Sequence, residues 1–320
     1  MLKKYWYAFK QIRFDIFNLE RSLVKSFYHL SFKGGEGRYV LMCDGLMKHG
    51  GFFDRMKGAI SIYALSKVHH KEFKLYFEHP FSLQKYLSPN SYDWTISKDS
   101  LNYRYPYAKP IIGYYEFLYP WRIQLKRYGE VHYYFGYNIL KKINKKYHQS
   151  FNWKQLYTEL FQPSEYLRRE IDKRLNIIGG CYIAVHLRFL NLLGDANESD
   201  AKYKALNKEE ADKLIMRCIY KIKELLQENP EHTLFLSTDS NVFMQKIKNK
   251  LKFYSVEGEI QHIDNVEKNC HDEPLKMFLD YYLLSHATKI FSLVGHGLYR
   301  SDFPQYAAII GGKNIVRIEI

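Results

Sequence analysis

The sequence predicts an α/β protein of two domains, the second of them doubly wound. Three observations lead to this expectation. A buried strand, a glycine-bearing loop, a helical face and another strand follow one another over residues 39–77, which is the order of a βαβ unit. Strands and amphipathic helices alternate again between residues 181 and 320. The chain has 320 residues, and about 150 residues per domain is the usual prior.

The first domain is assigned to residues 1–165. Its first predicted strand is the apolar run "YVLMC", residues 39–43, and its second is "FKLYF", residues 73–77. Between them one helical face carries Met56, Ala59, Ile60, Tyr63 and Ala64. Residues 80–150 are rich in Tyr, Lys and Pro and show no clean period, so we expect loops and short helices there. The pattern turns helical and charged around residues 161–176, where we place the linker.

The second domain is assigned to residues 175–320. Its predicted strands are "CYIAVHL", "TLFLS", "KIFSL" and "NIVRIEI". The helices between them are indicated by an apolar face over residues 211–225, by residues 241–251, by "EPLKMFLDYYLLSHA", in which Pro274 stands near a helix N-terminus, and by "DFPQYAAII". In such a doubly wound sheet a ligand is expected at the carboxyl ends of the strands.

The composition narrows the class of partner. The net charge is +14, which favours nucleotides, nucleic acid or an acidic membrane surface, although a Lys-rich soluble surface has the same balance. The basic residues are scattered and form no recognisable nucleic-acid module, so we expect no nucleic-acid partner. The 29 Tyr and 21 Phe suit surfaces that meet sugars or nucleobases, because a Tyr ring packs while its hydroxyl stays solvated.

The cysteines and the apolar runs indicate the cellular compartment of the protein. Cys43, Cys181, Cys218 and Cys270 are far apart and no CxxC occurs, so reduced thiols are expected and a structural zinc site is not. No run of eighteen apolar residues exists, and charges interrupt the first residues, so neither a membrane span nor a signal peptide is predicted. A cytoplasmic location follows.

The first residues, "MLKKYWYAFKQIRFDIF", carry a basic and aromatic stripe at helical spacing. Such a helix can lie in the interface of an anionic membrane, which would make the protein peripheral on its inner face. The alternative is that the stripe packs on the parent domain, which is the commoner fate of an amphipathic helix.

Three loops at predicted strand ends carry chemistry. "HGGFFDRMKG" offers glycines for close backbone approach before a helix N-terminus, but it lacks the GK[ST] of a P-loop. "HLR" places His186 and Arg188 where an arginine fork could bind a phosphate; a core hydrogen bond and a surface ion pair are the alternatives. In "LSTDSN", Asp239 could accept from ribose hydroxyls or a guanine edge, or could cap the following helix.

Together these motifs have the order and spacing of a known superfamily. "GGFFDRMKGAISIYALSK", "AVHLRF", "FLSTDSNVF" and "SLVGHGLYRSDFPQYAAIIGG" resemble the α1,2-, α1,6- and protein O-fucosyltransferases over roughly residues 39–312. The resemblance implies a GT-B fold, in which two Rossmann-like domains face each other across a cleft. It also implies GDP-fucose as donor, a glycan as acceptor, and an N-terminal acceptor-side domain before a C-terminal nucleotide-sugar domain.

The resemblance also implies roles for individual residues. Arg188 would hold the β-phosphate, with His186 beside it, and Asp239 would lie at the nucleoside end. The donor-binding positions that it implies are Gly50, Gly51, Arg55, His186, Asp239, Ser292, His296 and Ser301. For the base that deprotonates the acceptor, Asp54 is the leading candidate, although capping of its helix is an equal alternative. Asp195 and Glu198 are the other candidates, and the leaving phosphate itself could take the proton.

The sequence departs from the superfamily pattern in two places. "FLN" stands where many relatives carry a second Arg and an acid, and "VGHG" replaces a Ser pair, so that His296 would substitute. No Asp-x-Asp occurs, so we expect no metal ion or cofactor at the diphosphate. The adjacent residues of "CHDE", 270–273, rarely converge on one ion. Our interpretation is an inverting, metal-independent fucosyltransferase. The alternatives are a transferase for another nucleotide sugar and a non-catalytic protein that binds glycan or nucleic acid.

Overall fold

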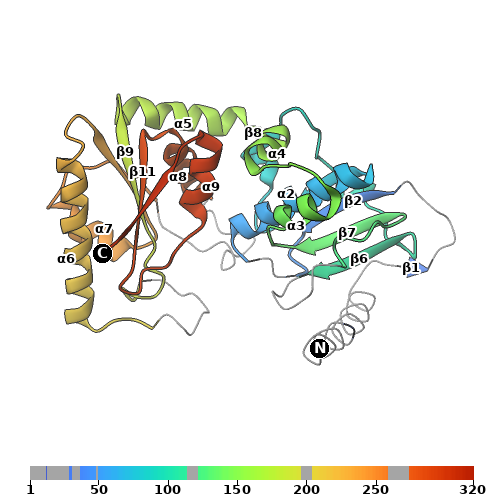
Figure 1. The fold of residues 1–320 in the computed structure, drawn as a ribbon, viewed down its shortest axis with the longest axis horizontal. Coiled ribbons are helices and arrows are strands. Elements are labelled where there is room, and N and C mark those ends of the chain that lie inside the picture. The colour runs from blue at the N-terminus through green and yellow to red at the C-terminus, as the bar shows by residue number, and fades with distance from the viewer. Residues whose placement is uncertain are drawn as a thin grey trace. The chain divides into compact units, whose positions relative to one another are not determined.

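The computed structural model describes residues 12, 29–30, 37–47, 50–113, 122–195, 204–258 and 274–320. The chain divides into two compact units, Met1–Gln162 (unit 1) and Pro163–Ile320 (unit 2). Each unit contains a four-stranded parallel sheet with helices packed beside it (Figure 1). Two such Rossmann-like units agree with the α/β fold class that the sequence predicts.

The sheet of unit 1 has the strand order β3-β2-β7-β6. Its strands are β2 (Arg38–Cys43), β3 (Glu72–Phe77), β6 (Ala108–Gly113) and β7 (Glu130–Phe135). Its helices are α2 (Phe52–His69), α3 (Leu140–Tyr147) and α4 (Trp153–Leu160). Short elements complete the unit: β1 (His29–Leu30) pairs with β5 (Arg104–Tyr105), β4 (Leu87–Pro89) pairs with β8 (Phe161–Pro163), and η1 (Leu83–Lys85) and η2 (Lys98–Ser100) are single 3₁₀ turns.

The prediction of loops and short helices over residues 80–150 was correct for η1, η2 and α3 but missed β6 and β7. All six residues of β7 are buried, yet its sequence "EVHYYF" includes Glu130 and His132. The two side chains are hydrogen-bonded to each other, and Glu130 is also bonded to Arg38. Glu130 Oε1 lies 2.7 Å from His132 Nε2, and Arg38 Nε donates to Glu130 Oε2 at 2.5 Å. Burial by itself raises the pKa of Glu130, but hydrogen bonds from His132, the backbone of Asn102 and Arg38 hold that pKa below its ordinary value.

Helix α2 is buried almost all round, and one glycine sets its approach to the sheet. A Cβ built on Gly58 would lie 1.8 Å from the carbonyl oxygen of Phe135 in β7. The contact is with backbone, so it cannot be relieved by turning a side chain.

We therefore expect Gly58→Ala to lower the free energy of unfolding by about 1–3 kcal/mol, as for an overpacked core. The better helix propensity of alanine, about 1 kcal/mol, offsets only part of this loss. Gly51→Ala at the N-cap of α2 is the control, because nothing lies within 4 Å of the carbon added there. Equal urea midpoints for the two variants would contradict the close approach.

The sheet of unit 2 has the order β10-β9-β11-β12. Its strands are β9 (Tyr182–Leu187), β10 (Thr233–Thr238), β11 (Lys289–Val294) and β12 (Ile315–Glu319), and they confirm the four strands predicted for this half. The helices are α5 (Glu165–Ile178), α6 (Lys208–Gln227), α7 (Asn241–Lys248), α8 (Leu275–His286) and α9 (Phe303–Gly311). Helix α7 ends at Lys248, three residues before the predicted end.

The two faces of this sheet differ in polarity. The face covered by α6 and α7 is apolar, with Val185, Leu187 and Leu236 packed against Ile215 and Phe243. The alternate strand residues point to the opposite side, which α8 and α9 cover (Figure 1). That second face carries polar groups, and the candidate site begins among them.

Candidate active site

The strand order of unit 2 reverses between β9 and β11. From β9 the chain passes to β10 on one side of the sheet, and then to β11 and β12 on the other. In open α/β sheets, ligands bind at this switch point, beyond the carboxyl ends of the strands. His186 in β9 and Arg188 just after it occupy this position, with Ser292 of β11 in register beside His186.

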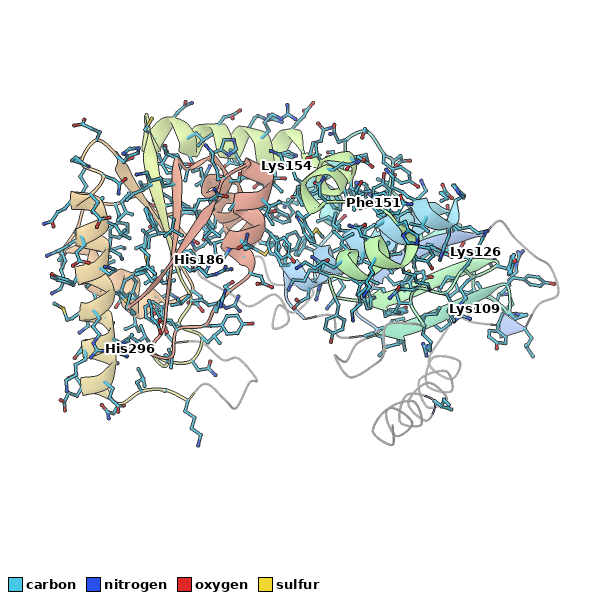
Figure 2. The ribbon with its side chains drawn as sticks, viewed as in Figure 1. Lys109, Lys126, Phe151, Lys154, His186 and His296 are labelled. Atoms are coloured by element: carbon cyan, nitrogen blue, oxygen red, sulfur yellow. The ribbon has the colours of Figure 1, made fainter. Side chains whose placement is uncertain are left out.

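The imidazole of His186 is held neutral. Its residue is only 6% exposed, and its ring stacks on Phe303 at the start of α9, with centroids 5.7 Å apart. Burial, and then the charge of Arg188, lower its pKa to about 3. The sequence alternative of a satisfied core hydrogen bond is not seen, since no bond joins its ring to another described residue. Figure 2 labels this side chain on the sheet of unit 2.

Arg188 lies between a carboxylate and an aromatic ring. Its Nε is 3.9 Å from Oδ2 of Asp239. The guanidinium carbon lies 5.4 Å from the ring centroid of Tyr299, and the backbone N–H of Tyr299 donates to the Arg188 carbonyl at 2.9 Å. The side chain is 25% exposed, so the cation is oriented by the protein while part of it remains accessible.

Asp239 stabilises the loop that carries Arg188. Its two carboxylate oxygens accept from the backbone N–H groups of Phe189 and Leu190, at 2.7 and 2.9 Å. The alternative of a helix cap was wrong, because Ser240 is the N-cap of α7 and its hydroxyl accepts from Phe243 N at 3.0 Å. Whether Asp239 also meets a nucleoside stays a prediction.

A second carboxylate, that of Asp195, connects the same two loops in the opposite direction. Asp195, in the loop after β9, accepts through Oδ2 from the Ser240 hydroxyl and from the backbone N–H of Val242, both at 2.8 Å. Its Oδ1 is buried and has no hydrogen-bond partner among the described residues. Thus the loop after β10 holds the loop after β9 through Asp239, and the loop after β9 holds the first turn of α7 through Asp195.

The burial of Asp239 predicts a pH effect on stability. Burial raises its pKa to about 6, against the opposing influence of Arg188 and of the backbone donors Phe189 and Leu190. The folded state then binds the proton more tightly than the unfolded state, whose carboxyl has a pKa near 3.8. The contribution of Asp239 to the free energy of unfolding therefore falls, by about 2–3 kcal/mol, as the pH rises from below 4 to above 6.

The measurement is the free energy of unfolding of the wild type and of Asp239→Asn across this pH range. The asparagine cannot titrate, so the difference between the two proteins should change through the window. Asp212→Asn, which removes a carboxylate that is 46% exposed on the same unit, is the control. A difference that stays constant with pH would contradict the raised pKa of Asp239.

The loop after β11 places its predicted residues in three different environments. Ser292 is buried in the sheet, and the hydroxyl of buried Ser301 accepts from Phe303 N at 3.1 Å at the start of α9. The exposed His296 lies beside α6 (Figure 2), where Nη1 of Arg217 is 2.8 and 2.9 Å from its ring nitrogens. His296 is therefore engaged by α6, whereas Tyr299 of the same loop contacts Arg188.

In unit 1 the early glycine loop leads into α2. Gly50 has a φ of +75°, which favours glycine, and Gly51 is the N-cap. Oδ2 of Asp54 accepts from Gly51 N at 3.2 Å, Oδ1 lies 3.2 Å from Lys57 Nζ, and the side chain is 42% exposed. The capping role is thus present, and the exposed carboxylate remains reachable by solvent.

Arg55 has a different environment from the one that its predicted role requires. It is 3% exposed, its Nη1 donates to the His79 carbonyl at 2.6 Å, and its guanidinium lies 5.4 Å from the ring centroid of Phe77. These contacts join α2 to the end of β3. Direct donor contact by Arg55 stays a prediction.

Sequence reasoning missed two acids near strand ends. Asp44, directly after β2, accepts from Leu46 N at 2.9 Å and from the Tyr134 hydroxyl at 2.7 Å. Asp280 of α8 is buried on the polar face of unit 2, where it accepts from Ser237 Oγ at 3.1 Å and from Lys276 Nζ at 3.2 Å. The strand end in "MCDG" and the four-residue Lys–Asp spacing in α8 were the available signals.

Several predictions fall outside the described residues. They are the amphipathic helix over the first residues, Glu198, and the "CHDE" tract at 270–273. Among the residues that are described, no group of three or more His, Cys, Asp or Glu side chains is placed to hold a metal ion. No helix in that part of the chain is long and apolar enough to cross a bilayer.

Comparison with solved structures supports the expected fold of two Rossmann-like units. The apo form of POFUT1 superposes with a TM-score of 0.54 at 10% identity, covering 91% of this chain and 100% of that one. Fucosyltransferase NodZ from Bradyrhizobium gives 0.52 at 13%, covering 86% and 94%. A mutant of Arabidopsis thaliana FUT1 in complex with GDP gives 0.53 at 12%, covering 90% and 72%.

The structures of similar fold thus include a fucosyltransferase, and the resemblance expected from the sequence is confirmed at the level of the fold. No protein-family model and no curated protein matches the sequence. That the two units face each other across a cleft stays a prediction.

Proposed function

We propose that the protein is an inverting, metal-independent glycosyltransferase that moves fucose from GDP-fucose to a hydroxyl of a glycan. The observation that carries the proposal is Arg188, an oriented and partly exposed cation at the switch point of unit 2. It is supported by the fold, which is shared with fucosyltransferases whose structures include NodZ soaked with GDP-fucose and NodZ co-crystallised with GDP.

In this proposal unit 2 binds the donor. The guanidinium of Arg188 takes the β-phosphate, because a planar fork matches phosphate oxygens and a diphosphate leaving group gains charge as its bond to the sugar breaks. The neutral imidazole of His186 supplies a hydrogen bond to the same diphosphate or to the ribose. A fixed side-chain cation at this position does for the leaving group what a metal ion does in other transferases.

Unit 1 takes the acceptor, and Asp54 is the proposed base. Of the two candidate carboxylates that are described, Asp195 has one oxygen occupied by Ser240 and Val242 and the other buried. Asp54 is 42% exposed, so a hydroxyl can reach it. General-base catalysis requires hydrogen-bond reach first, which favours Asp54.

The test is a hydrolysis screen without acceptor, using GDP-fucose, GDP-mannose, UDP-glucose and UDP-galactose in EDTA. We expect release of GDP from GDP-fucose in EDTA, with no gain from manganese. Turnover of a different nucleotide sugar would correct the donor. Binding of GDP without any turnover would indicate a protein that only binds, and activity that requires manganese would refute the metal-independent mechanism.

We further propose a cytoplasmic enzyme that works at the surface of an anionic membrane. The unpaired cysteines Cys43 and Cys218, both buried, and the net charge of +14 support this location.

Tyr299 should orient Arg188 for the diphosphate, so Tyr299→Leu is expected to raise the KM for GDP-fucose about twofold to fivefold. A cation–π contact at a partly exposed site contributes about 0.5–1 kcal/mol, which corresponds to this range. Tyr299→Phe keeps the ring and should retain the wild-type KM. Equal effects of leucine and phenylalanine, measured in initial-rate assays, would contradict a role for the ring.

A further inference from the structure

One edge of unit 1 gathers cations and exposed tyrosines from two loops. Tyr107 directly precedes β6, Lys109 is the second residue of that strand, and Lys126, Arg127 and Tyr128 precede β7. With the exposed Arg104 of β5, they form what we call the basic–tyrosine edge: Arg104, Tyr107, Lys109, Lys126, Arg127 and Tyr128. Figure 2 labels Lys109 and Lys126 at this end of unit 1.

The backbone brings the two loops into direct contact. The N–H of Glu130 donates to the Tyr107 carbonyl at 2.8 Å, and Ala108 and Lys109 pair in register with Glu130 and Val131. Gly129, with a φ of +80°, allows this approach, because a Cβ there would lie 2.0 Å from the Tyr107 oxygen. Lys109 and Arg127 are therefore held near each other by the sheet itself.

Among the described residues, no ion pair joins a cation of this edge to a carboxylate. The Nε of Arg127 is buried and has no hydrogen-bond acceptor among the described residues. Burial, and then the charge of Arg127, lower the pKa of Lys109, which places the two cations within electrostatic reach of each other. Glu130 is close in sequence but is 2% exposed and is bonded to Arg38 and His132.

The positive potential extends beyond the edge. His69, at the end of α2, has its pKa lowered to about 4 by burial and then by the charges of Lys126, Lys146, His70 and Lys71. A cluster of cations of this kind attracts external anions.

We propose that the basic–tyrosine edge docks unit 1 on a bilayer rich in anionic phospholipids. Phosphate oxygens of lipid headgroups would accept from Arg127 and Lys109. Tyr128 is 82% exposed and Tyr107 is 37% exposed, and amphipathic rings of this kind favour the headgroup region of a membrane. The inference rests on the peripheral location proposed above but not on the sugar transferred.

The edge lies at the amino ends of β6 and β7, whereas the Gly50–Arg55 loop follows the carboxyl end of β2. All neighbouring strands of this sheet are parallel, so the basic–tyrosine edge and the glycine loop lie at opposite ends of the strands. An enzyme docked in this way keeps its early glycine loop away from the bilayer and open to an acceptor.

The experiment is flotation of the full chain with phosphatidylcholine vesicles, with and without phosphatidylglycerol. We expect binding only to the anionic vesicles, weakened by salt. Each neutralised cation should cost about fivefold in partition coefficient, so Lys109→Gln with Arg127→Gln should lose on the order of twenty-five-fold. Lys126→Gln with Tyr128→Ser changes only exposed side chains and should also weaken binding without affecting the melting temperature.

The matched control is Lys213→Gln with Lys246→Gln, which removes two exposed cations from unit 2. Equal flotation of this control and both edge variants would overturn the proposal. So would capture of the protein by dextran sulfate with no binding to anionic vesicles, because the edge would then serve a soluble polyanion. Fucosyl transfer is measured separately in detergent-free solution with a soluble acceptor, so failure of the docking and failure of the proposed activity are distinguishable.

Discussion

Replacing Arg188 with alanine should lower kcat for fucosyl transfer by about a hundredfold to a thousandfold, the range measured for loss of one preorganised donor to a developing charge. Negative charge on the β-phosphate grows as the bond to the sugar breaks. A cation already oriented by Asp239 and Tyr299 therefore stabilises the transition state more than the ground state.

Arg188→Lys should restore only part of this activity, because lysine keeps the charge but loses the planar fork. GDP affinity by calorimetry should fall less than kcat in both variants. Arg169→Ala on α5 is the control, since that side chain is 78% exposed. A folded Arg188→Ala enzyme with wild-type kcat would show that the HLR motif does not serve the leaving group.

Asp54→Asn should lower kcat by about a hundredfold to ten-thousandfold, as expected when a general base is removed. The asparagine oxygen can still accept from Gly51 N, so the start of α2 should remain capped and the melting temperature should change little. The substitution thus separates the two roles that the sequence leaves open for Asp54.

Two further variants complete this test. Asp195→Asn should lower the melting temperature, because the neutral amide oxygen accepts more weakly than the carboxylate from both Ser240 and Val242, and it should change kcat less than Asp54→Asn does. Glu198→Gln examines the remaining candidate. If all three variants stay within about threefold of the wild type, no carboxylate among them is the base, and the leaving phosphate takes the proton.

The strands of unit 2 were predictable because each is a short apolar run, and β9 ends in the polar pair that marks the site. β7 was not predictable, because its buried Glu130 and His132 are compensated by Arg38, which lies 92 residues away from Glu130 in the sequence. Periodicity within a window cannot detect a partner at such a distance.

The sequence predicted where the candidate site lies better than it predicted which residues contact one another there. The strand end placed Arg188 correctly at the switch point, but nothing local indicated that Tyr299 would stack on it. Asp239 was predicted to meet a ligand or to cap a helix; its bonds to Phe189 and Leu190 of a neighbouring loop were not predicted, and its contact with a ligand stays a prediction. These assignments depend on which loops the parallel sheet brings together, and residue type does not determine that.

Asp195 and Asp239 each bond the loop of the other, which has a consequence for amide hydrogen exchange and for protein engineering. Each loop depends on the other, so the segments after β9 and β10 should open together in amide hydrogen exchange, as one unit of local unfolding. Their substitutions should couple in a double-mutant cycle, with the second loss costing less than the first. Replacing either loop alone with the loop of another transferase would leave a carboxylate or backbone donors without partners. The two segments should therefore be exchanged together.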